Sequence, residues 1–165
     1  MAVSRAVGAL FIVLILASCG TSAITEQLAP LREVKETITP ETIAGKTILT
    51  YDSQHGTQVE YVGSDWRVYL WYPGNTSVVK GLWKLDRDPL LPFIETMCFQ
   101  YVTRSRRTGL SRLTRWSCSP FGAYRSDVRD FAEGDVFGLA GGRLPFELDD
   151  RLTSIEQLQS QLAWE

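Results

Sequence analysis

From residue 47 onward, short segments rich in β-branched and aromatic residues alternate with turn-forming residues, and this alternation constrains the fold most. The first three such segments are residues 47–51 (TILTY), 57–62 (TQVEYV) and 66–72 (WRVYLWY). His55-Gly56 and Gly63-Ser64-Asp65 separate them, and residues of these types favour turns. The pattern predicts three strands joined by tight turns.

The same alternation continues through the middle of the chain. Residues 73–75 (PGN) suit a turn with proline and glycine at its centre, so residues 78–86 should return antiparallel to the preceding strand. Residues 96–103 and 110–118 form a further predicted hairpin around Thr108-Gly109. After a Pro-Gly break, residues 135–140 are predicted to add a last strand. Six to eight short antiparallel strands favour a mainly β domain, as a small barrel or half-barrel.

A short helix is predicted at each end of this β region. Residues 39–41 (TPE) are typical of an N-cap followed by proline at the first helical position, and Gly45 would end that helix. Residues 153–156 (TSIE) match a capping box, and the apolar residues between Ile155 and Leu162 follow a helical stripe. A chain of 165 residues has room for one such domain, expected over residues 39–165.

The amino-terminal segment resembles a bacterial lipoprotein signal peptide. Residues 6–17 (AVGALFIVLILA) follow Arg5 and carry no charged or polar side chain. A helix of that length spans roughly 18 Å, which is short of the roughly 30 Å hydrocarbon core of a bilayer. Residues 16–19 (LASC) resemble the lipobox. The resemblance implies a signal peptide at 1–18, cleavage before Cys19, lipidation of its thiol, and a lipidated tether at 19–38.

This resemblance implies a location in the cell envelope. Two or three acyl chains, such as palmitate, make desorption from a membrane very slow, so the domain would face the periplasm on a lipid anchor. Gly20, rather than aspartate, follows the cysteine, and in Gram-negative lipoproteins this favours the outer membrane. The alternative is an ordinary secretory signal in which Cys19 is incidental.

The cysteine count fits this location. Lipidation of Cys19 leaves Cys98 and Cys118 as a possible disulfide pair, which an oxidising compartment permits. Closing a loop of about 20 residues would stabilise the fold by about 3 kcal/mol. The alternatives are two buried thiols or a redox pair, although a redox pair normally has CxxC spacing.

A second resemblance concerns the domain itself. Its motifs are Gly45 to Ile48 (GKTI), Trp71 to Gly74 (WYPG), Gly81-Leu82-Trp83, Met97-Cys98-Phe99 and Cys118. They resemble small secreted proteobacterial proteins of uncharacterised, lipocalin-like families. The likeness covers roughly residues 41–120 and implies a small β-barrel without known chemistry. True lipocalins place Gly-x-Trp before the first long strand, whereas here it lies in the middle.

The sequence does not favour an enzyme. Its single histidine, His55, lies near Asp52 and Ser53, but no nucleophile-elbow pattern is present, so a solvated turn histidine is the preferred interpretation. Asp149-Asp150 precedes the final predicted helix, where negative charge favours the helix dipole. We expect no catalytic residues, no metal and no cofactor.

Two clusters remain as candidate binding surfaces. Five arginines without an acidic residue lie between the two later cysteines: Arg104, Arg106, Arg107, Arg112 and Arg115. They suit an anionic lipid or an acidic protein; the alternative is a solvated hairpin neutralised by residues 126–165, which hold nine acids and three arginines. Aromatic residues suit either a ligand pocket or simple core packing: Trp66, Trp71, Trp83 and Trp116.

These observations favour a non-enzymatic envelope lipoprotein whose β domain binds a ligand or a protein. The alternative is a scaffold subunit of an envelope complex, or an inhibitor of a lytic enzyme. A net charge of −2 gives no indication of nucleic acid as a partner.

Overall fold

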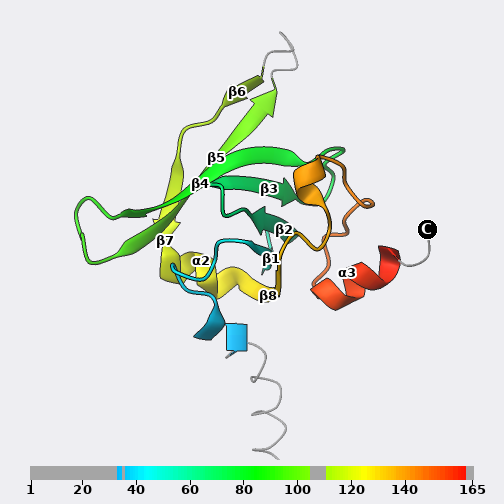
Figure 1. Ribbon diagram of the computed structural model, residues 1–165, viewed down its shortest axis with the longest axis horizontal. Helices are drawn as coiled ribbons and strands as arrows, with labels where there is room; N and C mark the ends of the chain where they lie inside the picture. Colours follow the sequence, from blue (N-terminus) through cyan, green and yellow to red (C-terminus); the bar gives the residue numbers. More distant parts are fainter. Residues whose placement is uncertain (1–32, 35, 105–110, 163–165) are drawn as a thin grey trace, which may run out of the picture.

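The computed structural model describes residues 33, 34, 36–104 and 111–162, and its core is one antiparallel sheet (Figure 1). Five strands follow in sequence order: β1 Lys46–Asp52, β2 Gly56–Val62, β3 Arg67–Trp71, β4 Val79–Arg87 and β5 Glu95–Arg104. Two short strands, β6 Ser111–Leu113 and β7 Ser117–Pro120, both pair with β5, and β8 Val128–Glu133 pairs with β1. The prediction of a mainly β chain of six to eight strands is confirmed.

The sheet is not closed into a barrel. Its strand order is β6-β5-β4-β3-β2-β1-β8, with β7 also on the outer side of β5. The helix α2, Phe121–Asp127, leads from β7 at one edge to β8 at the other and packs against β1, β5 and β7. Because a helix, rather than a strand, connects the two edges, the predicted barrel does not form.

Local sequence signals explain the first five strands, whose observed ends lie close to the predicted ones. At the turn after β3, Gly74 has a φ of +79° and the N–H of Asn75 donates to the carbonyl of Tyr72. This is the predicted turn, with proline and glycine at its centre. The single strand predicted at 110–118 is instead two strands, β6 and β7.

The predictions for the remaining elements need correction. The last strand is β8, because residues 135–140 lead into a 3-10 helix, η1 Leu139–Gly141, flanked by Gly138 and Gly142 in the left-handed conformation. The amino-terminal helix is displaced. Residues 33, 34, 36 and 37 are helical, whereas residues 39–43 form a turn in which Ile43 N–H donates to the Thr39 carbonyl.

The carboxy-terminal helix is confirmed as α3, Ile155–Leu162. Its cap lies one residue later than predicted, because Ser154 Oγ accepts the N–H of Gln157 at 3.2 Å. Asp130 of β8 accepts the N–H of Ile155 at 2.7 Å, so the start of α3 is bound to the edge of the sheet.

Both faces of the sheet carry a buried apolar layer. The inner core, on the face covered by α2, consists of Val34, Ile38, Ile43, Ile48, Val62, Val68, Trp83, Met97, Phe121 and Val128. The outer core, on the face covered by the carboxy-terminal segment, consists of Leu49, Val59, Tyr69, Trp71, Val78, Phe137, Leu139, Leu148, Ile155 and Leu158. Alternate residues of β1 and β2 serve the two cores, as expected for a strand buried on both sides.

The inner core includes residues that the sequence assigned to the tether. Val34 and Ile38 are buried there, and Ile38 is completely inaccessible to solvent. The folded domain therefore begins at or before Val34, rather than at residue 39.

Candidate functional site

Strands β5 and β6 form a two-stranded ribbon that extends beyond the rest of the sheet (Figure 1). The pairing of β4 with β5 ends at Gly81 and Tyr101, so residues 102–104 pair only with residues 111–113 of β6. We call these two segments the ribbon. All three residues of β6 are exposed, as are Val102 and Thr103. Because the ribbon is exposed, its side chains are not used to form the core and are accessible to a partner.

The base of the ribbon is fixed to the sheet by hydrogen bonds. The N–H of Thr114 donates to the Tyr101 carbonyl at 2.8 Å, and Thr114 Oγ1 accepts the N–H of Tyr101 at 3.1 Å. Gln100 Nε2 donates to the Thr114 carbonyl at 2.8 Å. These bonds interrupt the outer strand between β6 and β7, which is why one predicted strand appears as two.

A disulfide strengthens the same base. Cys98 of β5 and Cys118 of β7 lie opposite each other in the strand register and are joined by a bond of 2.03 Å. The predicted pairing of these two cysteines is confirmed. The ribbon is therefore an extension of a cross-linked pair of strands rather than a loose loop.

Two arginines at the ribbon and its base are exposed to solvent. Arg112 and Arg115 are exposed, and Arg104 ends β5, whereas Arg106 and Arg107 lie outside the described residues. Within the described ranges, no ion pair involves Arg112 or Arg115.

The acidic segment begins at the other edge of the sheet and then crosses its outer face. It begins around β8, which borders β1, whereas β6 borders β5, and Figure 1 shows β6 and α3 at well-separated parts of the molecule. Among the described residues, Arg112 and Arg115 are therefore not neutralised by contact with the acidic segment; neutralisation of the whole hairpin by residues 126–165 stays a prediction.

The candidate aromatic residues divide between core and surface. Trp71 and Trp83 are buried, and Phe137 and Phe146 pack edge-on against Trp71 at centroid distances of 5.4 and 5.0 Å. Trp116 is partly exposed at the base of the ribbon, with Lys84 Nζ 5.2 Å from the centre of its ring. The four tryptophans do not line one common pocket.

Trp66 is the most exposed of the four tryptophans. It lies in the turn between β2 and β3 with a φ of +65°, and its ring lies 5.0 Å from that of Trp83. A tryptophan with positive φ is uncommon, and here it keeps a large apolar ring at the end of the sheet.

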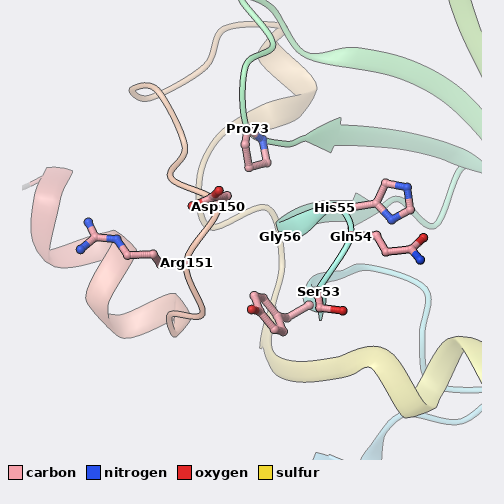
Figure 2. A pocket seen from close by; sticks show the side chains of 8 residues that line it. Ser53, Gln54, His55, Gly56, Pro73, Asp150 and Arg151 are labelled. Atoms are coloured by element: carbon pink, nitrogen blue, oxygen red, sulfur yellow. The ribbon is translucent and has the colours of Figure 1, made fainter.

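The single histidine borders a shallow hollow of about 380 Å³ at the turn between β1 and β2 (Figure 2). The hollow is lined by Tyr51, Ser53, Gln54, His55, Gly56, Pro73, Asp150 and Arg151. Figure 2 shows the side chains of His55 and Arg151 pointing away from each other, so the hollow does not direct its charged groups at one point.

His55 belongs to the hydrogen-bonded turn that contains Asp52. Its Nδ1 lies 2.9 Å from Asp52 Oδ2, and Asp52 Oδ1 accepts the N–H groups of Gln54 and His55. The His55 side chain and these backbone N–H groups hold the pKa of Asp52 below its usual value. Among the described residues, no hydrogen bond joins Ser53 to His55. The geometry is that of an exposed turn, as the preferred interpretation of His55 proposed.

Asp149 and Asp150 make other contacts instead of interacting with the amino terminus of α3. Asp149 Oδ2 lies 2.7 Å from Arg151 Nη2, and hydrogen bonds from Arg151 lower the Asp149 pKa to about 2. The carbonyl of Asp150 accepts the N–H of Thr57 at 3.2 Å, beside Gly56. A Cβ at Gly56 would lie 2.6 Å from that carbonyl oxygen, so glycine is required for this contact. The expected role at the helix start is filled by Asp130 instead.

A buried acid on the inner face was not predicted from the sequence. Glu60 of β2 is buried, and its carboxylate accepts hydrogen bonds from the hydroxyls of Tyr101 on β5 and Tyr124 on α2, the latter at 3.2 Å. Burial raises the pKa of Glu60, while the two hydroxyls act in the opposite direction. Burial and the neighbouring carboxylate raise the pKa of both tyrosines well above 10.

This Glu60 cluster joins three elements across the inner face. Gly81 of β4 makes room for it, since a Cβ there would lie 2.8 Å from the ring of Tyr101 and 2.7 Å from the Gln100 carbonyl. We interpret the cluster as a polar clamp that holds α2 against the sheet, because its hydrogen-bonding groups are directed at one another.

Within the described ranges, no group of histidine, cysteine or acidic residues is arranged to hold a metal ion. No helix in the described part of the chain is long and apolar enough to cross a membrane. No family model matches the chain, and no significant match was found among curated proteins or solved structures.

Proposed function

We propose that this protein is a lipid-anchored component of the cell envelope whose β domain binds an acidic partner protein through the ribbon. The leader ending in Cys19 supports the location, with the domain on the periplasmic side of the outer membrane. The disulfide between Cys98 and Cys118 supports an oxidising compartment. A binding role is favoured over catalysis because His55 pairs with Asp52 in an exposed turn, and the buried Glu60 is hydrogen-bonded to two tyrosine hydroxyls.

One observation carries the choice of surface. Arg112 and Arg115 are exposed beside β6, the outermost strand among the described residues, and neither forms an ion pair with the described part of the acidic segment. Arginine is the residue best suited to bidentate recognition of carboxylates. The exposed apolar residues Val102, Leu113 and Trp116 supply the apolar contacts that a protein interface needs at its centre.

The location is tested by mass spectrometry of the mature protein. We expect an amino terminus at Cys19 that carries diacylglyceryl and acyl groups, and we expect Cys19→Ala to abolish both processing and lipidation. An unmodified cysteine or an uncut leader would contradict this part of the proposal.

The binding surface is tested by crosslinked pull-down from intact envelopes, comparing Arg112→Glu/Arg115→Glu with wild type. We expect the variant to retain roughly tenfold less partner, because like charges repel at a contact made by arginines. The matched control is Arg143→Glu, an exposed arginine of the acidic segment, which should retain the wild-type amount. Equal retention by all three proteins would dismiss the ribbon, and binding to anionic vesicles alone would identify lipid rather than protein as its ligand.

A further inference from the structure

The loop between β4 and β5 presents three large apolar side chains to solvent. Leu90 is 87% exposed, Phe93 is 81% exposed and Leu91 is 45% exposed. Residues 89–94 (PLLPFI) contain no charged side chain. Single exposed apolar residues are ordinary, but a contiguous apolar tip of this kind marks a protein or membrane contact.

The loop has a defined structure that holds these side chains outward. Asp88 Oδ1 accepts the N–H groups of Leu90 at 2.8 Å and Leu91 at 2.9 Å. The N–H of Ile94 donates to the Leu91 carbonyl at 2.8 Å, and the N–H of Asp88 donates to the Ile94 carbonyl at 3.0 Å. Two prolines further restrict the backbone. Because the tip is already ordered, binding would cost little conformational entropy.

The position of the loop in the sheet indicates which way it faces relative to the proposed lipid anchor. The register aligns the end of β2 with the starts of β1 and β3, and the hairpin of β4 and β5 extends beyond that level. Val34, the first buried residue of the chain, lies in the inner core, against which Leu85 of this hairpin packs. Cys19 precedes Val34 by 15 residues, a distance of about 50 Å at full extension. The loop therefore lies at the end of the sheet where β1 begins, and the proposed tether is long enough to let this end meet the membrane.

Two further observations favour a bilayer over a protein partner. Trp66, at the same end of the sheet, exposes its indole, and tryptophan is the residue typical of the membrane interface. The ribbon lies at the other end of β5 from Glu95, where the loop joins the strand, and Figure 1 shows the loop and the ribbon projecting from separate parts of the molecule. Loop insertion would thus leave the arginines directed away from the membrane.

We infer that Leu90, Leu91 and Phe93 insert into the interfacial region of the bilayer that holds the lipid on Cys19. This inference rests on the proposed lipid anchor and adds an orientation to it. Interfacial helices bury their apolar face roughly 5–10 Å into the boundary between headgroups and acyl chains. We expect these loop side chains to reach a similar depth.

The experiment uses the full lipidated protein with Leu91→Cys, labelled with nitrobenzoxadiazole and reconstituted in phosphatidylcholine vesicles that contain doxyl-labelled lipid. Since Cys98 and Cys118 are bonded and Cys19 is lipidated, the introduced thiol is the one available to the label. The matched control is Gln54→Cys, an exposed position in the turn at the opposite end of β1 and β2.

We expect blue-shifted emission and roughly a twofold or greater loss of emission to the quencher at position 91, and neither effect at position 54. Adding Leu90→Ser and Phe93→Ser should abolish quenching at position 91, whereas the exposed Leu152→Ser should leave it unchanged. Unquenched label at position 91 in protein whose lipidation is verified by mass spectrometry would overturn the orientation and leave the anchor intact. Absence of lipid on Cys19 would overturn both proposals.

Discussion

The two ends of β5 differ in the side chains that they expose: one end is apolar and the other is positively charged. At one end, the loop Asp88–Ile94 holds an uncharged, strongly apolar tip in a fixed conformation. At the other end, Arg112 on the ribbon and Arg115 at its base are exposed, without acidic neighbours in the sequence. In the proposed orientation, one long strand separates the loop, which faces the membrane, from the ribbon, which faces a partner protein, and the disulfide and the Glu60 cluster lie between them.

Among changes to these two ends and the region between them, removal of the disulfide that joins β5 to β7 should have the largest effect. Cys98→Ser/Cys118→Ser should lower the free energy of unfolding by about 3 kcal/mol, because a loop of about 20 residues is no longer closed in the unfolded chain. Urea denaturation followed by tryptophan fluorescence measures the change. A loss below about 1 kcal/mol would show that the hydrogen bonds of Thr114 hold the base of the ribbon without help.

Salt should weaken binding at the ribbon, which depends on charge, but not insertion of the loop, which depends on apolar burial. Raising the ionic strength from about 50 to 300 mM should weaken partner retention at the ribbon by about tenfold, because exposed charges are screened. Quenching of the label at position 91 should change little, since salt does not weaken apolar burial. Both measurements can be made on the same reconstituted protein, and parallel loss of the two signals would contradict the division.

Glu60→Gln tests the polar clamp between the two ends through the pH dependence of stability. Glu60 has a raised pKa in the folded state, so above its ordinary value of 4.5 the unfolded chain releases this proton more readily than the folded one. This group therefore contributes a loss of stability as the pH rises from about 4.5 towards the folded pKa. The glutamine variant lacks that loss, so its unfolding free energy relative to wild type should increase between pH 5 and pH 8.

The comparison with wild type isolates this effect from the other carboxyl groups. The pKa values of Asp52, Asp86 and Asp149 are lowered, so their contributions are gained at pH values below the range used. A difference between variant and wild type that is the same at both pH values would show that Glu60 is not the titrating group.

The smallest expected effect concerns the stability of the loop variants. Leu90→Ser/Phe93→Ser should leave the free energy of unfolding within about 0.5 kcal/mol of wild type, because both side chains are exposed. Leu49→Ala, which removes a fully buried side chain, should by contrast cost about 2–5 kcal/mol. Thermal unfolding monitored by circular dichroism distinguishes these outcomes, and a large loss in the loop variant would assign the tip to the fold instead.

The sequence predicts the first five strands well because each is bounded by residues with strong turn preferences. The turn at Pro73-Gly74 is an example, since its glycine has the positive φ that such a turn requires. By contrast, α2 begins directly after Pro120 without a side-chain cap and buries one residue, Phe121, so it lacks both a start signal and a periodic apolar stripe. Its position depends on tertiary contacts with the sheet.

The candidate sites show the same division. The disulfide and the arginine-rich hairpin were predictable because cysteines and charges can be counted along the chain. Glu60 was not, because the alternation in residues 57–62 places it where a solvent-facing residue is expected. Glu60 is buried because Tyr101 of β5 and Tyr124 of α2 contact its carboxylate on this face. Exposure of the 88–94 tip was likewise hidden, since its composition suits a buried segment equally well.

The presence of apolar layers on both faces of the sheet has a consequence for how such a protein can change over time. Insertions or substitutions within the strands would disturb two packed interiors at once, whereas changes of length in residues 88–94 would disturb neither. A peptide grafted into this connection should therefore be accommodated by an otherwise unaltered scaffold. The surface chemistry of this loop is then free to change without loss of the fold.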